Sequence, residues 1–285
     1  MITNNPLIKP FLKWAGGKRQ LLAEIRKHLP GTTEDYTYYE PFVGAGAVFF
    51  DLQPKKAVIN DLNAELMLTY TTIKDDPEAL IELLKLHQKN HCKEYYYEMR
   101  NMDRDAESFN RLTNAEKTAR LIYLNKTCFN GLYRVNSRGL FNVPYGRYKN
   151  PAICEDDVMR HVSTYLNFSE IIILNGDFEQ AVSTADEKSF VYFDPPYYNP
   201  DKTGFTAYQA NGFDANEQKR LRDVMRYLTE RGVKCLLSNS DTEYIRELYS
   251  QPVFEIIPVK AIRAINSDPG RRGVVGEVLI RNWKE

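Results

Sequence analysis

The stretch FVYFDPPY, residues 190–197, predicts a buried strand and a sharp exit from it. Its first four residues are apolar or aromatic and include no turn former, as is typical of a strand inside a sheet. Two prolines remove backbone donors and restrict φ, so the chain must leave the sheet after Asp194. A carboxylate, carbonyl groups and an aromatic ring then meet at the carboxyl end of a strand, where open α/β sheets bind ligands. Such a corner suits a flat, polar substrate that carries an amino group.

The length and composition indicate a folded protein with one large domain, or one domain with an inserted lobe. The chain has 285 residues, of which 43% are hydrophobic and 27% are charged. No apolar stretch reaches the ~18 residues needed to span a membrane, and the N-terminus lacks an apolar core of signal-peptide length. The four cysteines have no paired spacing, which favours reduced thiols in a cytoplasm. The formal net charge is zero, which argues against a polyanion-binding tail but allows a local basic face.

Residues 11–22, FLKWAGGKRQLL, predict a glycine turn followed by a helix that starts near Lys18. A turn at a helix N-terminus that carries a lysine can hold an anion through backbone amides, the helix dipole and charge. A basic helix cap would explain the same residues. The segment is not a P-loop, because the first glycine of that motif is missing.

Residues 36–50, YTYYEPFVGAGAVFF, predict a short strand that ends at Glu40, a turn at Gly44 and Gly46, and an apolar helix. Glycines in such a turn let the backbone approach a nucleotide-like ligand closely. Residues 57–61, AVIND, predict a second strand that ends in Asp61, 17 residues beyond Gly44. An acid near this spacing accepts hydrogen bonds from ribose hydroxyls. The alternative is that Asp61 caps a helix over residues 62–73.

The alternation of strands and helices stops between about residues 69 and 167. Residues 77–88, 94–102 and 114–125 have apolar residues at helical spacing and predict three helices. The turn-rich segment 129–148 predicts a hairpin or extended loop with its tip near residues 136–139. His87 and His91 lie four apart beside Cys92, as in half of a metal site. Because no second pair of ligands is evident, we interpret them as surface and groove histidines and expect no metal.

Between residues 120 and 150 the chain carries six basic residues and no acidic one. The six are Arg120, Lys126, Arg134, Arg138, Arg147 and Lys149. Aromatic and asparagine side chains lie between them, a mixture typical of a nucleic-acid-binding surface. A solvated basic loop is the alternative, and the missing acidic residues favour nucleic acid over it.

The alternation resumes with predicted strands at residues 171–174 and 190–193. Asp177 follows the first of them and either caps the next helix or faces the ligand pocket. The segment 198–213 is long and polar, and it predicts a mobile flap over the site. Asp214 and Glu217 begin a helix that ends near residues 231–232. Residues 234–238, 253–259 and 277–282 bring the strands to about seven, and the arginines at 263, 271 and 272 form a second basic patch.

Six motifs follow one another in the chain: KWAGGKRQLL at 13–22, EPFVGAGAVFF at 40–50, INDLN at 59–63, NGLYRVNSRGLFNVPYGRYK at 130–149, GDFE at 176–179 and DPPY at 194–197. In this order and spacing they resemble the Dam-type DNA adenine-N6 methyltransferases, and the resemblance covers essentially the whole chain. The segment 130–149 is the most specific of the six. The departures are small, since GAG stands where many relatives have GGG and Phe129 stands where some have tyrosine.

The resemblance implies an α/β fold, namely a Rossmann-like, S-adenosylmethionine-dependent methyltransferase sheet of about seven strands. An inserted, mostly helical DNA-recognition domain with a β-hairpin would comprise residues 69–167, and the catalytic domain residues 1–68 and 168–285. The implied cofactor is S-adenosylmethionine, with Lys18 at its carboxylate and Asp61 at its ribose. The implied cofactor contacts are Trp14, Lys18, Phe42, Gly44, Gly46, Asp61, Asp177, Phe178 and Asp194.

The same resemblance implies that Asp194, Pro195 and Tyr197 hold the target amine and base. The implied DNA contacts, to which we add Arg138 of the basic segment, are Asn130, Leu132, Arg134, Arg138, Pro144, Arg147 and Lys149. The expected activity is site-specific methylation of a flipped-out adenine in double-stranded DNA, within GATC. The alternatives are an RNA or other planar-amine methyltransferase of this fold and an inactive DNA-binding relative. A nicotinamide oxidoreductase is disfavoured, because the full GxGxxG is missing.

The resemblance also suggests a bacterial cytoplasmic enzyme with no membrane partner. It leaves two biological settings open. In one, the enzyme protects DNA from a partner restriction endonuclease. In the other, it marks host DNA for repair and replication.

Overall fold

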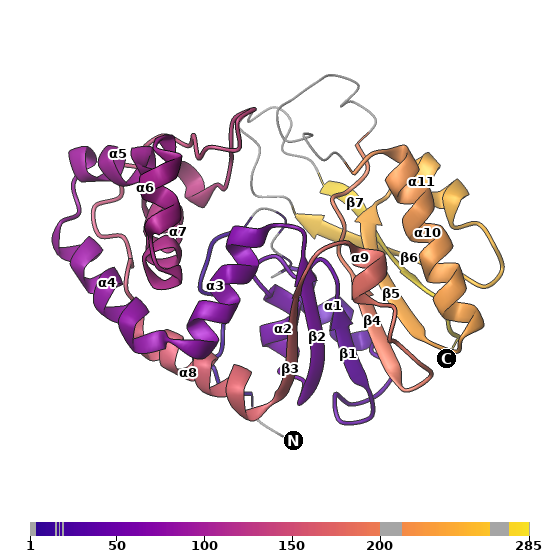
Figure 1. The fold of residues 1–285 in the computed structure, drawn as a ribbon. Coiled ribbons are helices and arrows are strands. Elements are labelled where there is room, and N and C mark those ends of the chain that lie inside the picture. Colours follow the sequence, from indigo (N-terminus) through magenta and orange to yellow (C-terminus); the bar gives the residue numbers. More distant parts are fainter. Residues whose placement is uncertain are drawn as a thin grey trace.

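A computed structural model of the chain describes residues 4–14, 16, 18, 20–199, 213–262 and 274–284 (Figure 1). These residues contain one seven-stranded sheet with the order β3-β2-β1-β4-β5-β7-β6. The strands are β1 Thr37–Glu40, β2 Lys56–Asp61, β3 Glu170–Asn175, β4 Ser189–Phe193, β5 Lys234–Ser240, β6 Glu255–Ile262 and β7 Val274–Arg281. Strand β7 runs antiparallel to both of its neighbours, whereas the pairs from β3 to β5 are all parallel.

Strand β4 lies at the centre of the sheet and is buried along its whole length. Successive side chains of a strand point to opposite faces of the sheet. Phe190 and Tyr192 therefore join the hydrophobic cluster on one face, and Val191 and Phe193 join the cluster on the other. Such burial on both faces explains the uninterrupted apolar sequence of this strand.

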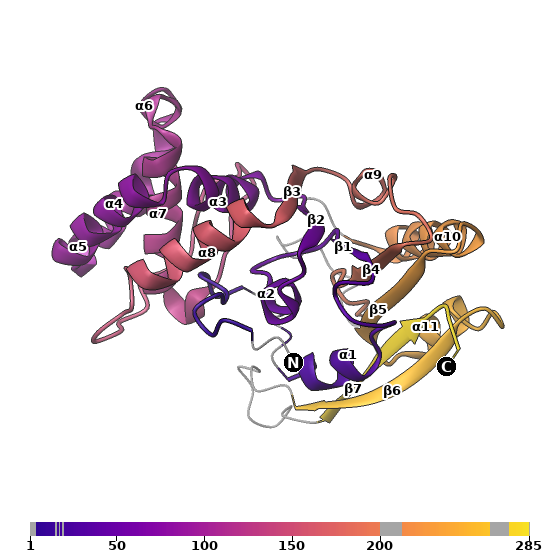
Figure 2. The same cartoon turned by 90° about the horizontal axis from the view of Figure 1, so that it is seen from below.

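The helices are α1 Leu22–Lys27, α2 Ala47–Leu52, α3 Ala64–Asp75, α4 Pro77–Lys89, α5 Lys93–Asn101, α6 Ala106–Arg111, α7 Asn114–Thr127, α8 Asp156–Phe168, α9 Phe178–Ala181, α10 Ala215–Glu230 and α11 Glu243–Leu248. Two short 3₁₀ turns, η1 Met102–Arg104 and η2 Phe129–Gly131, complete them. Helices α1 and α2 lie on one side of the sheet, and α9 and α10 lie on the other (Figure 2). Helices α4 to α7 form a group beside the β3 edge of the sheet (Figure 1).

The predicted strands and the three predicted helices of the middle segment are confirmed, with shifts of a few residues at their ends. The first helix begins at Leu22 and not near Lys18. Helix α8 was not predicted, although its buried residues recur at helical spacing from Val158 to Leu166. Residues 200–212 of the predicted flap and the second basic patch lie outside the described residues. The division into residues 69–167 and the rest of the chain stays a prediction.

The predicted hairpin over residues 129–148 is held by two isolated antiparallel bridges, Cys128 to Tyr145 and Val135 to Phe141. Its tip is at residues 136–139, as predicted, where the Gly139 amide donates to the Asn136 carbonyl over 2.9 Å. We call residues 129–148 the recognition hairpin below, after the role that the sequence predicts for them.

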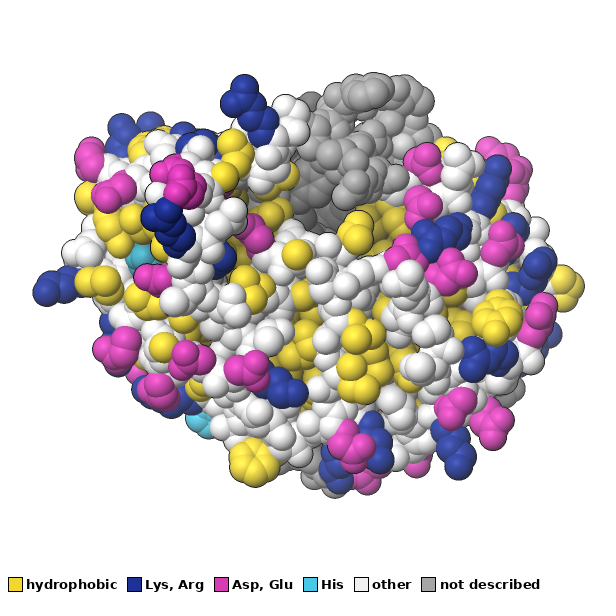
Figure 3. Space-filling model, viewed as in Figure 1, with side chains coloured by type: hydrophobic (Ala, Val, Ile, Leu, Met, Phe, Trp, Pro, Cys, Tyr) yellow, Lys and Arg dark blue, Asp and Glu magenta, His cyan; other side chains and the backbone are white. Residues whose placement is uncertain are grey.

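One expectation about a single residue is wrong. His87 does not lie at the surface, because it is 8% exposed and its Nδ1 lies 2.7 Å from the Tyr95 hydroxyl. Burial lowers the pKa of His87 to about 4. Strand β3 lies at the edge of the sheet, and its Ile172 is 56% exposed. Figure 3 shows hydrophobic side chains at the surface over β2 and β3, among interspersed charges of both signs.

None of the helices in the described part of the chain is long and apolar enough to cross a membrane.

Candidate active site

Asp194 follows the last residue of β4 and forms the centre of a compact polar cluster. The Lys18 ammonium lies 2.8 Å from Asp194 Oδ1, and the two side chains are only 9% and 17% exposed. Ser238, on β5, donates its hydroxyl to the same Oδ1 over 2.8 Å. Burial raises the pKa of the Asp194 carboxyl, while Lys18 and Ser238 lower it. The two donors therefore offset part of the cost of burying this carboxylate.

Lys18 also contacts the aromatic ring that follows the two prolines. Its ammonium lies 4.5 Å from the centroid of the Tyr197 ring and donates to the Gly16 carbonyl over 2.8 Å. The Tyr197 hydroxyl donates to Glu277 Oε2, on β7, over 3.0 Å. The Tyr197 ring is thus tied at its far end to the sheet and faces a cation on one side.

The backbone after Asp194 is held by buried amide side chains. Gln218, on α10, donates to the Pro196 carbonyl over 2.9 Å, and its own oxygen accepts from Asn239 over 3.0 Å. Asn239 Oδ1 in turn accepts from the Tyr198 amide over 3.1 Å. No described residue donates to the Pro195 carbonyl in this arrangement. The turn is therefore held on both sides of Tyr197, with one carbonyl left available.

The predicted glycine turn lies beside the end of β2. Gly44 and Gly46 have positive φ, and a Cβ at Gly46 would lie 2.6 Å from the Tyr70 hydroxyl oxygen. Asp61 accepts from the Gly44 amide over 3.1 Å and from the Asn63 amide over 2.9 Å. Burial raises the pKa of Asp61, and these amides lower it. The alternative that Asp61 caps the following helix is wrong, because Asn63 caps α3 and accepts from Leu66.

Trp14 joins the glycine turn to the recognition hairpin. Its ring stacks on Tyr133 with centroids 5.1 Å apart, and its Cδ1 lies 3.1 Å from where a Cβ on Gly44 would stand. Next to it, the buried Asn125 accepts from the Lys13 amide and donates to the carbonyls of Lys13 and Gly131. The segment before Lys18 and the base of the hairpin therefore share one set of contacts.

Two aromatic residues of the predicted cofactor site, Phe42 after β1 and Phe178 on α9, lie together. Phe42 stacks on Phe178 with centroids 5.2 Å apart. Asp177 caps α9 through the Glu179 amide and pairs with Arg220, whose guanidinium lies 4.5 Å over the Phe178 ring. The predicted helix cap at Asp177 is confirmed. Its pairing with Arg220 was not predicted.

The residues of the recognition hairpin with predicted DNA contacts are exposed, except Leu132, which is half-buried. The predicted set of six basic residues at a nucleic-acid-binding surface is nevertheless too large. Arg120 is 2% exposed and pairs with Asp103, and Lys126 pairs with Glu155. The acids that neutralise both residues lie outside residues 120–150, so the local count of charges missed them. Four exposed basic residues remain: Arg134, Arg138, Arg147 and Lys149.

Sequence reasoning missed the buried partners of the predicted site. Glu40, at the end of β1, accepts from the Tyr38 hydroxyl over 2.7 Å, and burial raises its pKa well above the usual range. Ser238, Gln218, Asn239 and Glu277 were likewise not singled out. A polar residue inside a buried strand or an apolar helix face was the one available signal for Ser238 and Gln218.

The fold and the polar groups at the carboxyl edge of the sheet define a class of protein. A mostly parallel seven-stranded sheet with an antiparallel β7, and with a glycine turn and acids at its carboxyl edge, is an α/β methyltransferase-like fold.

Comparison with known proteins identifies the family within that class. Residues 14–265 match the model of the D12 class N6 adenine-specific DNA methyltransferases, and the chain belongs to this family. A type II methyltransferase of Lactococcus lactis subsp. cremoris is 46% identical over 97% of this chain and 96% of its own. A type II methyltransferase of Methanocaldococcus jannaschii is 43% identical, over 97% and 99%. The DNA adenine methylase of Escherichia coli K12 is 35% identical, over 95% and 94%.

Proposed function

We propose that this protein transfers a methyl group from S-adenosylmethionine to the N6 amine of an adenine in double-stranded DNA. The observation that carries the proposal is the corner at Asp194, where a carboxylate that is only 17% exposed, an available Pro195 carbonyl and the Tyr197 ring lie together. The two oxygens match the two N–H groups of an adenine amine, and the ring matches its flat base.

The position of the Lys18 ammonium supports the assignment of this corner to a target amine. Its ammonium donates to Asp194 and lies over the Tyr197 ring, which are the two contacts that a target adenine amine would make. We infer that Lys18 releases Asp194 when the base enters and turns toward the cofactor carboxylate. The charge on Asp194 is then balanced by the substrate and not by the enzyme.

The chain's own residues would do most of the work of the reaction. Flipping an adenine out of a duplex costs a few kcal/mol, and stacking on Tyr197 offsets about 1–3 kcal/mol of this. Hydrogen bonds to Asp194 and to the Pro195 carbonyl localise the amine lone pair and stabilise the positive charge that develops on nitrogen. The bound cofactor supplies an electrophilic methyl group. Placing the amine in line with it is an orientation effect.

The glycine turn and its neighbours fit the cofactor. Gly46 has no room for a side chain, so the backbone can lie directly against a ligand. We assign the ribose hydroxyls to Asp61 and the adenine ring of the cofactor to the wall of Phe42, Asp177 and Phe178. Trp14, Lys18 and the turn at Gly44 would border its methionine part. Arg220 would remain on Asp177, so the cofactor amine would meet a carboxylate that is already partly neutralised.

Residues 69–167 would form a DNA-recognition unit, and the recognition hairpin within it would read the DNA sequence. We assign base contacts to Leu132, Arg134 and Pro144 and expect GATC as the target, following the Dam-type resemblance. The remaining contacts, to which no base is assigned, are Asn130, Arg138, Arg147 and Lys149. The two relatives that share 43–46% of this sequence are type II methyltransferases, which favours pairing with a restriction endonuclease over marking of host DNA.

The test is methylation of genomic DNA that lacks adenine methylation, followed by single-molecule sequencing of the modified sites. We expect N6-methyladenine at one short motif, GATC. Labelled methyl transfer to RNA but not to duplex DNA would refute the proposal. Methylation at another motif would leave the reaction standing and refute the GATC assignment.

A further inference from the structure

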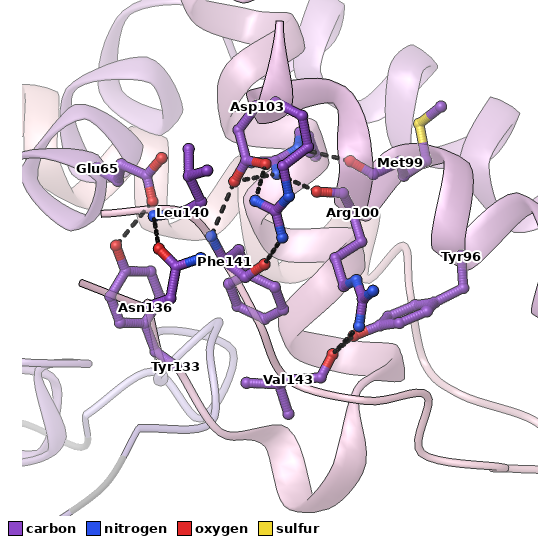
Figure 4. A network of polar contacts seen from close by, with 12 residues as sticks. Glu65, Tyr96, Met99, Arg100, Asp103, Tyr133, Asn136, Leu140, Phe141 and Val143 are labelled. Carbon is purple, nitrogen blue, oxygen red and sulfur yellow. Dashed lines mark hydrogen bonds and ion pairs between the residues drawn. The ribbon is translucent and has the colours of Figure 1, made fainter. Parts of the chain in front are cut away.

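The returning limb of the recognition hairpin, residues 141–143, is held by a support that lies outside the hairpin (Figure 4). Asp103 Oδ2, on η1, accepts from the Phe141 amide over 2.8 Å, and Arg104 donates to the Phe141 carbonyl over 2.6 Å. Tyr96, on α5, donates its hydroxyl to the Val143 carbonyl over 2.8 Å. The side chains of Phe141 and Val143 are buried. Phe141 and Val143 are thus each held by backbone hydrogen bonds and by burial of their side chains.

The support is itself rigidly held. Arg120 lies 2.9 Å from Asp103 Oδ2 and donates to the carbonyls of Met99 and Arg100 over 2.7 and 3.0 Å. These carbonyls belong to the last turn of α5, where a cation is favourable. A buried ion pair of this kind adds little net stability, and its best-attested use is to specify one geometry.

Fixing residues 141 and 143 determines how Asn142 lies between them. In an extended chain, the N–H and C=O of successive residues point to opposite sides. Asn142 therefore faces the outgoing limb, and its amide donates to the Arg134 carbonyl over 3.0 Å. The Arg134 guanidinium donates to Asn142 Oδ1 over 2.7 Å and to the Asn142 carbonyl over 3.2 Å. Two hydrogen bonds thus hold an exposed guanidinium in one plane.

We propose that Asp103, Arg104 and Tyr96 are specificity-determining positioning residues, which set the sequence preference of the enzyme without touching DNA. The inference rests on the proposed function, since it needs Arg134 to read a base. An arginine discriminates guanine through two parallel hydrogen bonds in a fixed plane. A recognition group must be held to within about 0.5 Å by its supporting contacts. Here these contacts run from α5 and η1 through residues 141–143 to Arg134.

The test compares the sequence preference of Asp103→Asn and Tyr96→Phe with that of the wild type. Asp103→Asn keeps an oxygen for the Phe141 amide but leaves Arg120 without its counter-charge. Tyr96→Phe removes one hydroxyl. Asp105→Asn is the matched control, because Asp105 is exposed, lies two residues away and caps α6. Each protein methylates random-sequence duplex DNA, and sequencing gives the rate ratio between the preferred motif and motifs with one base changed.

In both variants we expect this rate ratio to fall about tenfold, equivalent to 1.4 kcal/mol. The fall should occur for changes at the same base position that Arg134→Ala affects. Their affinity for S-adenosylmethionine should match that of the control. Combining Asp103→Asn with Arg134→Ala should lower the ratio no further than Arg134→Ala alone, because both changes remove one interaction.

Two results would overturn the proposal. One is a ratio equal to that of Asp105→Asn in both variants, even with a lowered melting temperature, because the support would then be merely structural. The other is full additivity in the double variant. If Asp103→Asn does not fold, Tyr96→Phe replaces it in both comparisons, alone and combined with Arg134→Ala. A wild-type enzyme that methylates DNA without any sequence preference would instead remove the proposed function on which the inference rests.

Discussion

Replacing Lys18 with methionine should destabilise the protein in a way that depends on pH. The variant keeps most of the apolar stem but leaves the buried Asp194 carboxylate without the cation 2.8 Å away. Breaking a fully buried ion pair costs about 3–5 kcal/mol. Because Ser238 still donates to Asp194 and the Asp194 side chain is 17% exposed, we expect a smaller loss of about 2–3 kcal/mol at neutral pH. In a protein of this size this lowers the melting temperature by roughly 4–8 °C.

The sign of the pH dependence follows from the pKa of Asp194. Burial raises it above the value of an unfolded chain, and Lys18 lowers it. A carboxyl with a raised folded pKa contributes stability while it is protonated, and that contribution is lost as the pH rises through its folded pKa. Lys18→Met raises the pKa of Asp194 further. The gap in stability between wild type and variant should therefore be small near pH 4 and widen as the pH rises toward neutrality.

Thermal unfolding of both proteins at several pH values measures this gap. Lys27→Met is the control, because Lys27 is exposed and pairs only with Glu24 on its own helix. A gap for Lys18→Met that stays constant from acid to neutral pH would refute the reasoning. It would mean that the lost packing of the stem, and not the charge on Asp194, accounts for the effect.

Three further predictions concern single steps of the proposed reaction. Asp194→Ala should abolish labelled methyl transfer and still bind duplex DNA in a gel-shift assay; near-normal turnover would remove Asp194 from the mechanism. Asp61→Ala should weaken S-adenosylmethionine binding, measured by calorimetry, by about 30–150-fold if two ribose hydrogen bonds of ~1–1.5 kcal/mol each are lost; an unchanged affinity would argue against a ribose contact. Gln218→Leu should lower kcat with little change in cofactor affinity, because it frees the Pro196 carbonyl and misplaces Tyr197, whereas a change in cofactor affinity alone would contradict this role.

The sheet could be predicted from the sequence because each strand carries its own signal. The apolar run at 190–193 and the prolines after it determine the end of β4 regardless of the rest of the chain. The glycine turn and Asp61 could be found for the same reason, since their spacing is local. Helix α8 could also have been found, because its apolar residues follow the helical period.

What could not be predicted depends on contacts between distant segments. Arg120 and Lys126 have the same sequence signature as Arg134, yet Asp103 and Glu155 neutralise them in the folded protein. Lys18 and Asp194 are 176 residues apart in the chain, so nothing local shows that they form a pair. Gln218 and Asn239 resemble ordinary polar residues until the turn they support is seen.

The stack of Trp14 on Tyr133 bears on how such enzymes can be re-engineered. Exchanging the hairpin between relatives is an obvious route to a new target sequence. Yet Tyr133 stacks on Trp14, which itself lies against Gly44 of the glycine turn. The Gly131 carbonyl accepts a hydrogen bond from Asn125, and Gly131 lies close to the Lys13 side chain. A transplanted hairpin that lacks these two residues would change sequence choice and cofactor affinity together. Grafts should therefore keep positions 131 and 133 and vary the exposed positions between 134 and 144.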